Sequence, residues 1–281
     1  GVFGAPLAVA AASGVGTALL FVLVAVTGTA VAAYHPLSSM LVGRTAAEGR
    51  GNGMMSYFIA GGNAGMAFVP LVLVAFLENL SLSALPLLIL PAALMGVFFV
   101  RSGMCAVSSL PEHAVQSRPK LSSVLFARTT ITLNLAMGLR CWTHGAFGTF
   151  LPLLLVGNGE DTSAAGLFLT IFMVGGMMGG LFGGNLADKF TGRGIIVTFL
   201  VLGILPCAYY FTHVSTDVLG GIVLFAAGFA LMAPQPSSII WAQQALPENA
   251  GMASGMMLGM SFGLGSLGVA ATAALGDVIG L

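Results

Sequence analysis

Arg140 is the residue of this chain most suited to binding chemistry, because it places a permanent charge inside a long apolar segment. The segment begins near residue 124, so Arg140 lies close to its middle. His144 follows one helical turn later and extends the same polar face. A guanidinium donates two parallel hydrogen bonds to a carboxylate or phosphonate, which predicts an anion-binding role. The alternative is a structural role, in which Arg140 binds backbone carbonyls or extends towards a membrane surface.

Three further polar residues lie inside apolar segments. His35 precedes Pro36 and is either a titrating group or a partner for the carbonyl that the proline frees. Gln235 also precedes a proline in a later segment, but it cannot titrate. Asn63 lies between glycines and is either a cavity ligand or a hydrogen-bonding residue between helices. We expect these three residues to line one pathway with Arg140 and His144.

The acidic residues are placed differently, since all nine lie in or beside the loops between apolar segments. A protein that couples to protons usually needs a titrating group within the membrane. The apolar segments of this chain therefore leave open whether a histidine or another group carries the proton. The sequence has no metal-ligand spacing, nucleophile elbow or phosphate-binding loop, so we predict no enzymatic activity and no cofactor.

The elements that must position these residues are transmembrane helices. Apolar residues make up 57% of the chain and charged residues only 6%, with a mean hydropathy of +1.01. Soluble domains carry about 25% charged residues, so a lipid bilayer is the expected partner. The zero net charge gives no case for nucleic acid binding. Helices are expected over nine segments, namely 2–13, 16–41, 53–77, 83–101, 124–155, 163–186, 194–212, 217–242 and 250–275.

An internal repeat organises these segments. The run from His35 to Met40 is answered by the run from Gln235 to Ile240, at an offset of 200 residues. A period this long predicts a duplicated helical bundle. On a pattern of six plus six helices, the chain would hold helices three to eleven of twelve. The predicted parts are an N-terminal bundle over 1–101, a cytoplasmic loop over 102–121 and a C-terminal bundle over 122–281.

Glycines spaced four residues apart predict close helix contacts on two segments. One ladder comprises Gly176, Gly180 and Gly184, and the other comprises Gly251, Gly255, Gly259 and Gly263.

Basic residues predict the orientation, because they gather in alternate loops while the opposite loops have none. We therefore expect an inner-membrane protein whose cytoplasmic loops contain Arg44, Arg50, Arg101, Arg118, Lys120, Lys189 and Arg193.

The loop after segment 163–186 runs from Gly184 to Gly194 and reads GNLADKFTGRG. It resembles the G-x-L-a-D-r-x-G-r-r signature of the major facilitator superfamily, with Thr191 as one inserted residue. Asp188 can accept hydrogen bonds from a neighbouring helix N-terminus. The resemblance implies a loop that controls conformational switching, so the gating candidates are Gly184, Asp188, Lys189, Gly192 and Arg193.

A narrower resemblance implies the activity. The runs AYHP from Ala33, GGNAG from Gly61 and LRCW from Leu139 look like the fosmidomycin-resistance subfamily. That resemblance implies a monomeric efflux transporter driven by proton exchange, with an anionic or phosphonate-like small molecule as substrate. The alternative is a metabolite importer of the same fold, and a polytopic membrane enzyme is a weaker one.

Overall fold

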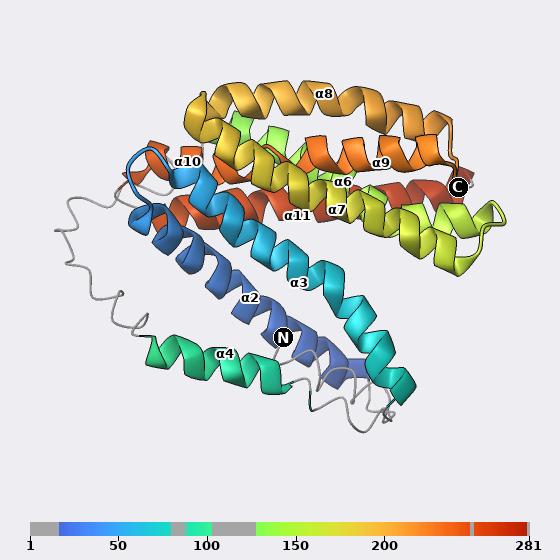
Figure 1. Cartoon of the computed structure of the whole chain (residues 1–281), viewed down its shortest axis with the longest axis horizontal. Helices are drawn as coiled ribbons and strands as arrows, with labels where there is room; N and C mark the ends of the chain where they lie inside the picture. Colours follow the sequence, from blue (N-terminus) through green and yellow to red (C-terminus); the bar gives the residue numbers. More distant parts are fainter. Residues whose placement is uncertain (1–16, 80–86, 88, 103–127, 248–249, 280–281) are drawn as a thin grey trace. The chain divides into compact units, whose positions relative to one another are not determined.

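A computed structural model describes residues 17–79, 87, 89–102, 128–247 and 250–279 (Figure 1). The predicted helix over 2–13 and the loop residues 103–121 lie outside these ranges. Within them the chain is helical and contains no strand. The helices are α2 (Thr17–Thr45), α3 (Gly51–Asn79), α4 (Ile89–Arg101), α6 (Arg128–Gly157), α7 (Thr162–Lys189), α8 (Gly192–Thr212), α9 (Val218–Met232), α10 (Gln235–Ala245) and α11 (Ala250–Ile279).

The chain forms two compact units. The smaller unit comprises Gly1–Tyr34 and Val69–Pro119 and includes α4. The larger unit comprises His35–Phe68 and Lys120–Leu281, and every site discussed below lies within it. The bundle boundaries expected from the sequence, at residues 101 and 122, stay a prediction.

Length and composition confirm an all-α membrane fold. In the described part of the chain, four helical stretches are long and apolar enough to cross a membrane: Thr162–Lys189, Gly192–Thr212, Val218–Ala245 and Ala250–Ile279. In the larger unit α7 packs on α9 and α6 packs on α11, so the long helices run alongside one another (Figure 1).

The expected single helix over 217–242 is wrong in one respect, because α9 ends at Met232 and α10 begins at Gln235. Pro234 and Pro236 have no N–H, so two bonds of the helical ladder cannot form there. The Pro234 carbonyl still accepts from the Ser238 N–H at 3.0 Å, which restarts the helix after the interruption. The corresponding Pro36 lies within a continuous α2.

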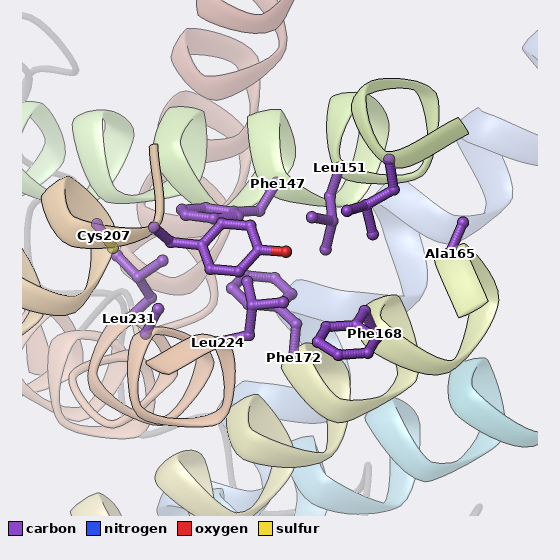
Figure 2. Packing of buried hydrophobic residues seen from close by; sticks show 11 residues of the cluster. Phe147, Leu151, Ala165, Phe168, Phe172, Cys207, Leu224 and Leu231 are labelled. Atoms are coloured by element: carbon purple, nitrogen blue, oxygen red, sulfur yellow. The ribbon is translucent and has the colours of Figure 1, made fainter. Parts of the chain in front are cut away.

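An aromatic core holds α6, α7, α8 and α9 together (Figure 2). The Phe147 ring stacks on Phe172 with centroids 5.0 Å apart, and both side chains are buried. Leu224 and Leu231 of α9 and Cys207 of α8 complete the contact. A second cluster includes Met55, Ile239 and Met257, so residues of α3, α10 and α11 share one core.

The repeat is visible in the contacts as well as in the sequence. A Cβ added at Gly251 would lie 3.2 Å from the Met40 Sδ atom, and one added at Gly51 would lie 3.7 Å from Ile240 Cδ1. Met40 and Ile240 are repeat partners, and each contacts a glycine at the start of the other half's next helix. This pairing is what a duplicated bundle with pseudo-twofold symmetry produces.

Two acidic residues of the larger unit cap helix N-termini at one end of the bundle, where Thr216 also donates to Glu160 at 2.7 Å. The Asp161 Oδ1 atom accepts from the Ala164 N–H at 2.6 Å, at the start of α7. Asp217 caps α9, and the N–H of Gly220 together with the Ser215 hydroxyl keeps the pKa of Asp217 below its ordinary value. These carboxylates therefore serve helix ends.

The glycine ladders predict only part of the observed packing. The closest approach of α7 to α9 uses Gly175, Gly179 and Gly183, where an added Cβ would collide with α9 backbone atoms or Ala233. Gly180 has only ordinary contact, and Gly259 and Gly263 have no described atom within 4 Å of an added Cβ. The prediction is wrong for Gly180, because the four-residue spacing does not reveal which of two adjacent stripes faces a neighbour, and for Gly259 and Gly263 it stays a prediction.

We expect Gly179→Ala to lower the stability of the full-length protein and Gly180→Ala to leave it nearly unchanged. The Gly179 Cβ would collide with the Phe229 carbonyl, whereas that of Gly180 would lie 3.8 Å from the Met232 oxygen. Overpacking of this kind costs about 1–3 kcal/mol. Thermal unfolding in detergent measures the difference, and equal melting temperatures for the two variants would contradict this packing.

Candidate functional site: a carboxylate latch and a buried arginine

The Asp188 side chain binds the first turn of α3. Its Oδ1 atom accepts from the Asn52 backbone N–H at 2.9 Å and from the Asn52 amide at 3.0 Å. Its Oδ2 atom accepts from the Gly53 N–H at 2.7 Å. The first N–H groups of a helix have no partner within it, and the helix dipole favours a negative charge there. The structure thus contains the helix N-terminus contact that we expect for Asp188, and we call it the carboxylate latch.

Two glycines allow the latch to form. A Cβ added at Gly184 would lie 2.5 Å from the Ser56 Cβ atom and 2.6 Å from the Asn52 carbonyl, so α7 and α3 approach closely. A Cβ added at Gly53 would lie 2.6 Å from Asp188 Oδ2. Larger residues at either position would displace the carboxylate from the helix end.

The rest of the signature loop surrounds the latch. Thr191, the inserted residue, caps α8 by accepting from the Gly194 N–H at 3.1 Å, and Gly192 begins that helix. Lys189 is exposed at the end of α7. The Arg193 guanidinium lies 6.0 Å from the centre of the Trp241 ring, within the range of a cation–π contact. A cavity of about 670 Å³ is bordered by Asp188, Gly192 and Arg193, and also by Arg44 and Glu48.

A second polar contact, which the sequence analysis missed, joins α2, α10 and α11. The Gln243 amide donates to the Ser39 carbonyl at 3.0 Å and to the Ser254 hydroxyl at 2.8 Å. Gly43 makes room for it, because an added Cβ would collide with Gln243 Oε1. Gly43 and Gln243 are repeat partners at an offset of 200, and that pairing is the signal that could have identified the contact.

Arg140 is buried in the larger unit, with 4% of its surface exposed. Its Nη1 atom donates to the Leu231 carbonyl at 3.1 Å and contacts the Met232 sulfur at 3.1 Å. Its Nη2 atom lies 2.9 Å from the Cys141 sulfur. The carbonyl contact fits the structural alternative, since Leu231 lies where the helical ladder is interrupted. The Nε atom is also buried and has no described hydrogen-bond partner.

The structure brings Arg140 and Gln235 together in one cavity, which His144 does not line. Arg140, Gln235 and Ser261 line one small cavity between α6, α10 and α11. His144 instead lies against Phe172 of α7, with ring centroids 5.1 Å apart. The polar face predicted along α6 therefore divides between two neighbours.

The two remaining candidates lie on the N-terminal helices. His35 is an exposed residue of α2, and Asn63 is half-buried on α3. Neither lines the Arg140 cavity. Whether they belong to a shared pathway remains a prediction.

A larger apolar cavity of about 360 Å³ lies between α6, α8 and α11. Aromatic side chains line it, including Trp142, Phe150 and Tyr210. The Trp142 ring nitrogen donates to the Thr272 hydroxyl at 2.9 Å, which leaves few free polar groups there. Arg140 does not line this cavity, so apolar volume and charge are separated in the larger unit.

The long apolar helices, their glycine contacts and the repeated halves define a polytopic α-helical membrane protein. The family profile described as Major Facilitator Superfamily matches residues 1–269. The chain therefore belongs to the Major Facilitator Superfamily, a family of membrane transporters and not of enzymes.

Two curated relatives align with most of the chain. It is 29% identical over 267 residues to the uncharacterized MFS-type transporter YfnC of Bacillus subtilis. It is 26% identical over 260 residues to the fosmidomycin resistance protein of Escherichia coli. Each alignment covers 90% of this chain and 63% of the relative, so the chain spans less than two thirds of either protein. No solved structure matches the chain.

We expect Asp188→Asn in the full-length protein to open the contact between α7 and α3, because the amide lacks the charge that favours a helix N-terminus. A cysteine in place of Ser56, which is buried against Gly184 of α7, reports the opening in a background without native cysteines. A loss of about 1–2 kcal/mol would raise its maleimide labelling rate about 5- to 30-fold.

Asp161→Asn is the matched control, since Asp161 caps only its own helix. Labelling at the parental rate in Asp188→Asn, or an equal rise in Asp161→Asn, would contradict the latch.

Proposed function

We propose that the full-length protein is a secondary active transporter that works by alternating access. The observation that carries this proposal is the carboxylate latch, in which the signature loop after α7 binds the N-terminus of α3. Hydrogen bonds to a helix end form and break as a unit, so the contact can have two discrete states. On this proposal the latch is closed when the substrate site faces away from the cytoplasm, and it opens in the other half of the cycle.

The proposed orientation places the latch at the cytoplasmic face of an inner membrane. Arg44, Lys189 and Arg193 all lie around it, in loops that the positive-inside rule assigns to the cytoplasm. Asp161 and Asp217 lie at the opposite helix ends, where the loops have no basic residue.

The proposed substrate is a small anionic molecule, exported as a drug or metabolite. Similarity to a fosmidomycin resistance protein supports a role in drug resistance, for which we propose export, and the buried guanidinium of Arg140 supports an anion. Opening the cavity around Arg140 and Gln235 would expose donors for an acid group. A metabolite importer is the second candidate, because one gate serves transport in either direction.

Proton exchange is the proposed energy source, with no cofactor and with a monomer as the working unit. Three described carboxylates of the larger unit, Asp161, Asp188 and Asp217, serve helix ends. The candidate carriers are therefore His35 on α2 and acidic residues outside the described ranges. Collapse of the proton gradient with a protonophore is expected to stop export.

Growth of a drug-sensitive host with the full-length gene tests the function across a panel of antibiotics that includes phosphonates. We expect Arg140→Ala to remove resistance to anionic compounds and Arg140→Lys to restore part of it, because lysine keeps the charge but not the paired donors. Arg128→Ala is the matched control, since Arg128 is exposed at the start of α6.

Expression in the membrane is checked for each variant. A panel in which the intact gene protects against no compound would remove the support for efflux. Full resistance with Arg140→Ala would reject the anion-binding role while leaving transport intact.

A further inference from the structure

The charge of Arg140 has no carboxylate partner among the described residues. Its three hydrogen-bonding contacts are to a carbonyl, a thioether and a cysteine sulfur, and none of them is a carboxylate. The guanidinium stays protonated in proteins, so it cannot lose the charge on burial. An uncompensated buried charge is strongly unfavourable. The surroundings of Arg140 therefore favour an anion.

Unused polar groups converge beside this charge. Arg140 Nε, Ser261 Oγ and Gln235 Oε1 are all buried and have no described hydrogen-bond partner. All three residues are more than nine-tenths buried, and all three line one cavity. A half-turn of the Gln235 amide presents its NH₂ group to the same space. The cavity can thus offer donors from α6, α10 and α11.

The size of the cavity restricts its occupant. The cavity is small, with a volume of about 10 Å³. A phosphonate or carboxylate has several heavy atoms and does not fit this conformation. A single-atom anion needs only donors and positive charge around it.

We propose that this cavity is a binding site for one chloride ion, held by Arg140 Nε–H, the Ser261 hydroxyl and the Gln235 amide. The ion neutralises the guanidinium and leaves Nη1 on the Leu231 carbonyl, where α9 gives way to α10. Bound chloride therefore stabilises the interruption between these helices. The site shares Arg140 and Gln235 with the proposed substrate pathway. Its test does not depend on that function, because chloride binding to the folded protein needs neither transport nor a substrate.

Thermal unfolding of the purified full-length protein tests the site, with chloride exchanged for gluconate at constant ionic strength. We expect chloride and bromide to raise the melting temperature in a saturable way, because binding to the folded state alone stabilises it. Ser261→Ala removes one donor and is expected to raise the half-saturating chloride concentration about tenfold. Bromide anomalous scattering from crystals should place a peak within hydrogen-bond distance of Arg140 Nε.

Ser237→Ala is the matched control, because Ser237 Oγ is also buried and unpartnered but lines a different cavity. Its chloride response should equal that of the parent. Identical melting in chloride and gluconate would overturn the proposal and indicate a water molecule in the cavity. A chloride response unchanged by Ser261→Ala would also overturn it, because that result describes a general salt effect.

Discussion

The larger unit depends on one electrostatic constraint, the satisfaction of the α3 N-terminus by the Asp188 carboxylate. Three hydrogen bonds join this side chain to Asn52 and Gly53, residues more than 130 positions away along the chain. The N-terminal amides of a helix need acceptors, and a carboxylate supplies both acceptors and favourable charge. Gly53 and Gly184 keep the backbones close enough for these bonds. The latch consequently determines whether α3 and α7 can remain in contact.

The charged side chains of the larger unit occupy two kinds of position, at helix ends and in the interior. The described acids Asp161, Asp188 and Asp217 all hold helix ends, so they stabilise the bundle at its surfaces. Arg140 is the opposite case, since it is buried where two prolines interrupt the ladder between α9 and α10. Backbone polar groups freed in a membrane-spanning helix need new partners. Arg140 supplies one of them at Leu231, and its remaining donor makes the nearby cavity attractive to an anion.

The long helices, the family and the binding of Asp188 to a helix N-terminus could be predicted from the sequence, because hydropathy and motif spacing can be read from short stretches of the chain. The sequence did not predict the interruption after Met232, since Pro36 occupies the same repeat position within a continuous helix. The closest contacts of α7 with α9 use glycines one residue before the predicted ladder for a similar reason. Gly179 and Gly180 are equivalent in spacing, and only the path of α9 distinguishes them. The neighbours of Arg140 and the Gln243 contact likewise depend on helices that are distant in sequence.

Spin labels at Glu48, in the loop before α3, and at Lys189, at the end of α7, would test the latch most directly. Both positions are exposed, and both lie in the larger unit beside the Asp188 contact. In the full-length protein in lipid, pulsed electron paramagnetic resonance should find a short and a long distance. The account predicts that Asp188→Asn increases the long-distance population. One short distance, identical in the parent and in Asp188→Asn, would contradict the claim that this carboxylate controls the gate.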